Sequence, residues 1–193
     1  MKNNSKLILY VFVIAFFVIL SLISDQSLKL ILSGLCLMAM SIFMYFNLED
    51  ITEVSKDNPK FKNLKIFLII CSVITILFFV LTITSKNNKL DSNNFKYIYA
   101  TLIFILFLIL GNLAPKLPMN KNIGLRVPWT LKNVSTWNAT HRFLGYLSII
   151  LAIIYLPGVF IIPNFALWTS FIVLVLVILS TIFSYVYYNK NKD

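Results

Sequence analysis

One stretch of the sequence, Asn112 to Arg142, concentrates the side chains that could bind or react. It contains both arginines of the chain, its single histidine, His141, and two of its three tryptophans. Guanidinium groups bind phosphates and carboxylates, and indoles suit membrane interfaces and binding surfaces. Connections usually run about 4–6 residues, so a stretch of about 30 residues with this composition is predicted to be structured or functional.

The same stretch offers little for catalysis. A lone histidine without a nucleophile arrangement, metal-ligand spacing or phosphate-binding loop is more often a structural hydrogen-bonding residue than a catalytic one. Cys36 and Cys71 lie in apolar runs without a CxxC partner, which is typical of small buried hydrophobic residues. The sequence therefore predicts that the protein is not an enzyme and has no metal site and no cofactor.

The elements that position this stretch are predicted to lie in a membrane. Hydrophobic residues make up 59% of the 193-residue chain and charged residues only 12%, against roughly 25% charged in soluble domains. The net charge of +10 comes from lysines between apolar runs. This pattern is typical of membrane orientation signals and indicates contact with anionic lipids, with no direct nucleic-acid partner.

The apolar runs predict an all-α fold, a polytopic bundle of six transmembrane helices. Each run is apolar on all sides and close to the ~20 residues that cross a bilayer. The basic start of the chain precedes the first run without a cleavage site, so that run is interpreted as an uncleaved helix. Pro157 either ends the fifth helix or kinks it. The expected spans are Leu7–Ser24, Leu28–Asn47, Lys65–Thr84, Tyr97–Ala114, Phe143–Ile162 and Pro163–Tyr188.

The distribution of lysine and arginine predicts that both termini are cytoplasmic. With an inner N-terminus, 13 basic residues fall on inner segments and four on outer ones. The chain then divides into transmembrane helices 1–4 (residues 1–110), a cytoplasmic loop (111–142) and helices 5–6 with a basic tail (143–193). The inner residues are Lys2, Lys6, Lys56, Lys60, Lys62, Lys65, Lys116, Lys121, Arg126, Lys132, Arg142, Lys190 and Lys192; the outer ones are Lys29, Lys86, Lys89 and Lys96.

The first part of the inner loop is predicted to break the fourth helix and turn. Pro115 and Pro118 end that helix, and Asn112 is expected to satisfy backbone groups exposed by the break. Gly124 permits a tight turn beside Arg126.

The second part is predicted to return to the membrane as a helix. Pro128 keeps Val127 extended and places Trp129 at headgroup level. Asn133 and Ser135 are alternative N-caps for the returning helix. On it, two pairs of residues four apart share a face: Trp137 with His141, and Asn138 with Arg142.

The two arginines need partners that the loop does not supply, because no acidic residue lies between Asp91 and Asp193. Headgroup phosphates, backbone carbonyls and a ligand are possible. We expect one arginine to pair with the acidic cluster of the other long inner loop. A simple interfacial anchor, with Trp and Arg at headgroups and no further role, is the alternative to a binding site. The acidic cluster comprises Glu49, Asp50, Glu53 and Asp57.

The loop resembles the SdpI family of multi-pass membrane proteins. The resemblance rests on the run Ile123-Gly-Leu-Arg-Val-Pro-Trp-Thr-Leu131 and on flanking residues up to Thr140-His-Arg142, and it covers about the last half of the chain. Val127 stands where family members often have Thr. The residues singled out as the site are Asn112, Pro115, Lys116, Gly124, Arg126, Pro128, Trp129, Thr130, Trp137, His141 and Arg142.

The resemblance implies immunity to a secreted peptide toxin of the sporulation-delaying type. It also implies a possible receptor role, in which a cytoplasmic transcriptional repressor is held at the bacterial plasma membrane. A small transporter or a lipid-active membrane enzyme is the alternative. That alternative would need an intramembrane polar site, and the expected spans carry no interior charge apart from Lys29 near one end.

Overall fold

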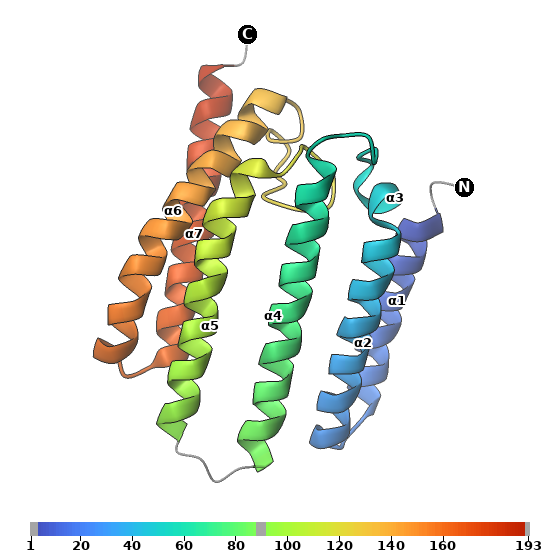
Figure 1. The fold of residues 1–193 in the computed structure, drawn as a ribbon, viewed down its shortest axis with the longest axis vertical. Coiled ribbons are helices and arrows are strands. Elements are labelled where there is room, and N and C mark those ends of the chain that lie inside the picture. Colours follow the sequence, from blue (N-terminus) through green and yellow to red (C-terminus); the bar gives the residue numbers. More distant parts are fainter. Residues whose placement is uncertain (1–3, 88–91, 192–193) are drawn as a thin grey trace. The chain divides into compact units, whose positions relative to one another are not determined.

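The computed structural model describes residues 4–87 and 92–191, and these residues form helices and irregular connections without a strand. The chain divides into two compact units, Met1–Lys89 and Leu90–Asp193 (Figure 1). The all-α prediction is therefore confirmed. Of the basic residues used to predict orientation, Lys2, Lys89 and Lys192 lie outside the described residues.

The first unit contains three long helices and one short one. The helix α1 spans Asn4–Leu22, α2 spans Gln26–Phe46, α3 spans Leu48–Thr52 and α4 spans Phe61–Asn87. The turn between α1 and α2 is tight because the Asp25 carboxylate caps α2, accepting from the Leu28 backbone N–H at 2.8 Å. The side chains along the long helices are largely exposed, as suits helices that face lipid.

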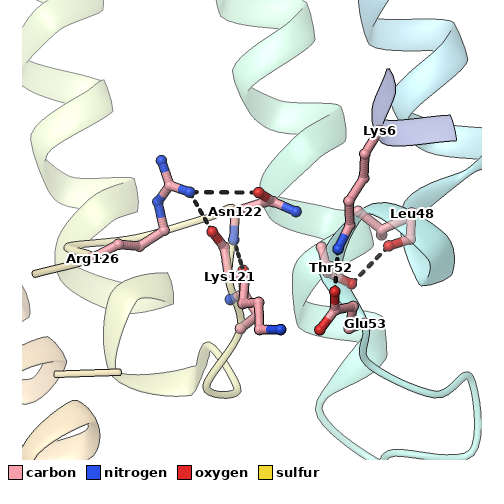
Figure 2. Close-up of polar contacts among 8 residues, drawn as sticks. Lys6, Leu48, Thr52, Glu53, Lys121, Asn122 and Arg126 are labelled. Carbon is pink, nitrogen blue, oxygen red and sulfur yellow. Dashed lines mark hydrogen bonds and ion pairs between the residues drawn. The ribbon is translucent and has the colours of Figure 1, made fainter. Parts of the chain in front are cut away.

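The short helix α3 forms the packed end of this unit. Leu48, Ile51 and Leu64 are each 1% exposed or less, so α3 buries its apolar face where α2 ends and α4 begins. Its last turn is held by Thr52 Oγ1, which donates to the Leu48 carbonyl at 2.7 Å, and the Lys6 ammonium pairs with Glu53 just beyond it (Figure 2). The sequence pattern did not predict α3, because five residues are too few to show a period.

The second unit contains α5 (Ser92–Leu113), the 3-10 turn η1 (Ala114–Lys116), α6 (Val134–Ile161) and α7 (Phe165–Lys190). The three long helices lie side by side and alternate in direction (Figure 1). Hence the end of α5, the loop 117–133, the start of α6 and the end of α7 share one end of the unit. The core of the unit lies where these helices meet: Ala100, Phe107, Leu151, Ala152, Tyr155, Val159, Ile172 and Leu176.

The hairpin between α6 and α7 is fixed by aromatic contacts at the opposite end of this unit. Trp168 Nε1 donates to the Tyr155 carbonyl at 3.0 Å, and the Tyr155 and Thr169 hydroxyls lie 3.1 Å apart. Gly158 makes room for the indole, since a Cβ there would lie 2.3 Å from the Trp168 ring. Pro157 lies inside α6, so of the two alternatives for this proline the helix continues through it.

Within the residues that the structure describes, five helices are long and apolar enough to cross a membrane: Ser5–Leu22, Phe61–Thr84, Phe95–Lys116, Val134–Ile161 and Phe165–Lys190. The remaining expected span, Leu28–Asn47, corresponds to α2, whose apolar part, Ile31–Phe46, is shorter. The exact number of spans and the orientation with both termini inside therefore stay predictions. The fifth expected span, Phe143–Ile162, lies in α6, whose first turns are residues 134–142, and Asn133 is its N-cap, one of the two predicted from the sequence.

Candidate functional site in the loop between α5 and α6

The loop begins at a close crossing of α5 and α6. A Cβ on Gly145 would lie 2.8 Å from the Gly111 carbonyl oxygen and 2.7 Å from Pro115 Cγ. The proline ring that ends α5 therefore rests on the bare backbone of α6. Small residues allow this kind of close crossing between membrane helices. The break at Pro115 is confirmed, and Gly145 is the partner residue that the sequence analysis did not single out.

Asn120 holds the first turn of the loop together. Its amide Nδ2 donates to the carbonyls of Pro118 (2.9 Å) and Ile123 (3.0 Å). Its Oδ1 accepts from the backbone N–H groups of Asn122 (2.9 Å) and Ile123 (2.7 Å). The side chain is 4% exposed, so all of its donors and acceptors are used inside the protein. Asn120 is a second residue that was not among the expected site residues.

Trp137 and His141 form the buried centre beneath the loop. They are 0% and 1% exposed, and their rings stack with centroids 4.0 Å apart, which confirms that they share a face of α6. The Trp137 indole N–H donates to the Leu117 carbonyl at 3.1 Å. This bond ties the loop's first residues to α6 across 20 positions of sequence.

His141 holds the middle of the loop with both ring nitrogens. Nε2 accepts from the Leu125 backbone N–H at 3.2 Å, and Nδ1 lies 2.9 Å from the Trp137 carbonyl. A backbone N–H can only donate, so Nε2 must be unprotonated, and a carbonyl can only accept, so Nδ1 carries the proton. The ring is therefore neutral, in the Nδ1–H tautomer, and serves as a structural bridge.

Gly124 lets the loop pass directly over this histidine. Its φ of +110° is a conformation that favours glycine. A Cβ at this position would lie 2.4 Å from His141 Nε2 and 3.2 Å from Trp137 Cη2. The sequence predicted the tight turn beside Arg126. Only the structure shows that there is no space for a side chain at Gly124.

The segment Val127–Thr130 is a compact turn. The Thr130 N–H donates to the Val127 carbonyl at 3.0 Å, with Pro128 at the second position, where its fixed φ suits such a turn. The buried Thr130 hydroxyl accepts from the Val127 N–H at 3.1 Å and lies 3.0 Å from the Leu125 carbonyl, to which it can donate. Thr130 therefore stabilises both sides of the turn that presents Trp129.

Trp129 joins this turn to α7. Its indole N–H donates to Ser184 Oγ at 2.7 Å, and its ring packs edge-on against Tyr185 with centroids 5.2 Å apart. Ser184 is fully buried, and its own hydroxyl donates to the Thr181 carbonyl at 2.8 Å. The headgroup-level position expected for this indole stays a prediction, but its polar atom has a partner inside the protein.

The two arginines differ in their surroundings. The exposed guanidinium of Arg126 donates to the Lys121 carbonyl and lies 3.5 Å from Asn122 Oδ1 (Figure 2). Of the partners considered from the sequence, Arg126 therefore binds a backbone carbonyl. Arg142 is exposed on α6, and within residues 4–87 and 92–191 the structure gives it no hydrogen-bond or ion-pair partner.

The expected pairing of an arginine with the acidic cluster stays a prediction. Within the first unit, Glu53 pairs with Lys6, and Glu49 lies 3.3 Å from Lys56.

The side chain of Asn112, at the end of α5, binds a lysine in place of the backbone groups expected for it: its Oδ1 accepts from the Lys116 ammonium. Asn138 is half-buried on α6 beside the exposed Arg142.

The loop is thus a folded cap with an inner and an outer layer. Its buried side chains hold the backbone: Asn120, Thr130, Trp137 and His141. Its charged side chains point away from this core: Lys116, Lys121, Arg126, Lys132 and Arg142. The cations of the cap therefore lie on its exposed side, whereas the buried side chains determine its shape.

Comparison with known proteins agrees with this part of the chain. Residues 116–188 match the SdpI/YfhL protein family. A stretch of 87 residues is 33% identical to the immunity protein SdpI of Bacillus subtilis (strain 168), covering 44% of this chain and 42% of that relative. No solved structure matches. The apolar helices and this relationship identify a multi-pass cell membrane protein, and the resemblance of its C-terminal unit to the SdpI family is confirmed.

Proposed function

We propose that this chain is an integral membrane immunity protein that gives its cell resistance to a secreted peptide toxin, by binding and without catalysis. The observation that carries the proposal is the match of residues 116–188 to the SdpI/YfhL family, with a relative named as an immunity protein. The matched residues include the whole folded cap from Lys116 to Arg142 and nearly all of α6 and α7. The shared part therefore covers the cap together with α6 and α7, whereas α5 lies outside the matched residues.

The architecture suits resistance at the membrane itself. A toxin that attacks the bilayer meets the apolar helix surfaces and the ends of the helices before it meets anything in the cytoplasm. The exposed faces of α6 and α7 carry large apolar side chains, among them Ile153, Phe160 and Phe171. Such surfaces can receive an amphipathic peptide by the same apolar contacts that they make with lipid.

The proposal is tested by expressing the chain in cells that are sensitive to the secreted toxin of an SdpI-bearing producer. Cells with the protein should survive the toxin, and cells with the empty vector should lyse. Equal killing of both, with the protein present in the membrane fraction, would contradict immunity to that toxin.

A receptor role is the second candidate, and the charge of the cap favours it. Residues 92–191 contain no aspartate or glutamate, and six cations lie at the end of the unit that carries the cap: Lys116, Lys121, Arg126, Lys132, Arg142 and Lys190. A surface whose charged residues are all cationic attracts anionic partners. We propose that, when toxin is present, this surface holds an acidic cytoplasmic regulator, of which a transcriptional repressor is the expected kind.

Relocation of a fluorescent regulator tests the receptor role separately from immunity. A repressor encoded beside this protein should move to the membrane when toxin is added, and Arg126→Ala should return it to the cytoplasm. Lys96→Ala, at the opposite end of α5, is the matched control and should leave relocation unchanged. A regulator that stays cytoplasmic with the wild-type protein and toxin would contradict this role while leaving immunity intact.

A further inference from the structure

A groove opens in the first unit between α2 and α4. It encloses about 260 Å³ and is lined almost entirely by apolar side chains. Its two serine hydroxyls are already used, since Ser41 Oγ donates to the Leu37 carbonyl at 2.9 Å and Ser72 Oγ to the Leu68 carbonyl at 2.8 Å. An occupant of this groove therefore needs no polar groups along its length. The lining residues include Met38, Ile42, Phe46, Ile69, Val73 and Ile76.

The groove continues along α2 as a narrow crevice. The crevice shares Met38, Ser41, Ser72 and Ile76 with the groove and ends where Phe79 packs against Gly34. A Cβ on Gly34 would lie 2.2 Å from the Phe79 ring, so this end is closed. From Gly34 to Tyr45 the helix rises about 16 Å at 1.5 Å per residue. One leaflet of a bilayer contributes about half of its ~30 Å hydrocarbon core, which is a similar length.

The other end of the groove carries a cation. Lys65 Nζ lies 5.4 Å from the ring centroid of Tyr45, a groove-lining residue, and 5.5 Å from that of Phe61. Within the described parts of the chain, Lys65 has no carboxylate partner. In the same unit, Glu49 pairs with Lys56 and Glu53 pairs with Lys6.

We infer that this groove binds one phospholipid with a net negative headgroup. An acyl chain lies along the groove, parallel to α2 and α4, and the headgroup phosphate meets the Lys65 ammonium and the Tyr45 hydroxyl. The apolar lining and its length suit an acyl chain. The inference is independent of the immunity proposal, because it concerns residues 34–79 only.

Native mass spectrometry of the full-length protein, released from detergent and titrated with phosphatidylglycerol or phosphatidylcholine, tests the inference. We expect one lipid to be retained under activation that strips all others, with phosphatidylglycerol retained preferentially. Ser72→Phe fills the groove and should lower retention about tenfold or more, since excluding two methylenes of a chain has that effect. Ser41→Leu fills the groove from the opposite helix and should also lower lipid retention.

Lys65→Gln tests the contact with the lipid headgroup separately from the contact with the acyl chain. It should abolish the preference for phosphatidylglycerol over phosphatidylcholine and leave retention of one lipid intact. Lys62→Gln and Ile153→Phe are matched controls on exposed positions outside the groove, and both should behave like the wild-type protein. Circular dichroism of each variant verifies its helix content.

Two results would overturn the inference. One is equal lipid retention by the wild-type protein, Ser72→Phe and Ser41→Leu, which would mean that the retained lipid lies elsewhere. The other is a fall in thermal stability of both groove-filling variants in lipid-free detergent with no change in lipid retention. That outcome would mean that another segment of the chain, and not a lipid, fills the groove.

Discussion

The indole N–H of Trp129 donates to the buried hydroxyl of Ser184 at 2.7 Å, across 55 positions of sequence. This single bond connects the turn Val127–Thr130 to the last third of α7. The turn is itself fixed to α6, because His141 accepts from Leu125. The cap therefore contacts two helices through specific polar groups, and its position depends on both.

Removing the indole donor should loosen the cap without unfolding the unit. Trp129→Phe keeps the aromatic contact with Tyr185 but loses the hydrogen bond, and should lower the free energy of unfolding in detergent by about 1 kcal/mol. Ser184→Ala should cost a similar amount, and the double variant little more than either alone, as expected for two partners of one bond. Additive losses would mean that the two residues act independently.

Replacing the Asn120 amide by a carboxylate should disrupt the first turn of the cap. Asn120→Asp loses both donors and faces the carbonyls of Pro118 and Ile123 with negative charge, so the free energy of unfolding should fall by about 1–3 kcal/mol or more. Asn138→Asp, on a half-buried part of α6, is the matched control and should cost less than half as much. Equal losses would show that the hydrogen bonds of Asn120 are not what holds the turn.

Adding one methyl group at the crossing of α5 and α6 should separate these helices. Gly145→Ala places a Cβ 2.8 Å from the Gly111 carbonyl oxygen, which is backbone and cannot swing away. We expect a loss of about 1–3 kcal/mol, as for other overpacked sites. Tyr146→Ala, next in sequence but 68% exposed, should change thermal stability little. A Gly145→Ala protein as stable as the wild type would contradict the close crossing.

The protonation of His141 can be measured directly. Solid-state nitrogen NMR of the protein in lipid, with labelled histidine, should show a single neutral imidazole with the proton on Nδ1, because the chain has one histidine. Glutamine carries its acceptor oxygen and its donor nitrogen together at the end of the side chain. His141→Gln should therefore lose at least one of the two hydrogen bonds. Detection of a proton on Nε2 at neutral pH would contradict the bond from the Leu125 N–H.

The sequence was sufficient to predict the long helices because each apolar run is long, and several of them begin or end at a residue with a known role. Asn133 is the N-cap of α6, its Oδ1 accepting from the Ser135 N–H at 2.8 Å, and Pro115 follows the end of α5 at Leu113. Residues 134–142 mix polar and aromatic side chains and lack the hydropathy of a span, so the candidate N-caps Asn133 and Ser135, and not hydropathy, predicted that the helix begins before Phe143. The same stretch is helical in the structure because its buried face packs under the cap.

The site was predictable in composition but not in its contacts. Unusual residue types drew attention to Trp137 and His141, and helical spacing predicted that they share a face. The partners Ser184 and Gly145 lie inside apolar runs, where a serine or glycine has no distinguishing pattern. Only the small-residue preference of membrane helix crossings could have indicated Gly145. Long-range pairing of this kind depends on how α5, α6 and α7 pack.

Resistance to toxin is the measurement that tests the central claim most directly. Toxin-sensitive cells would express the wild-type chain, Arg142→Glu or Lys60→Glu, with membrane levels of each protein matched by immunoblot. The wild-type chain should restore survival. Arg142→Glu reverses an exposed charge of the cap that has no partner within the described residues and should reduce survival, whereas Lys60→Glu, in the other unit, should not. Survival with the wild-type chain no higher than with the empty vector would contradict the account.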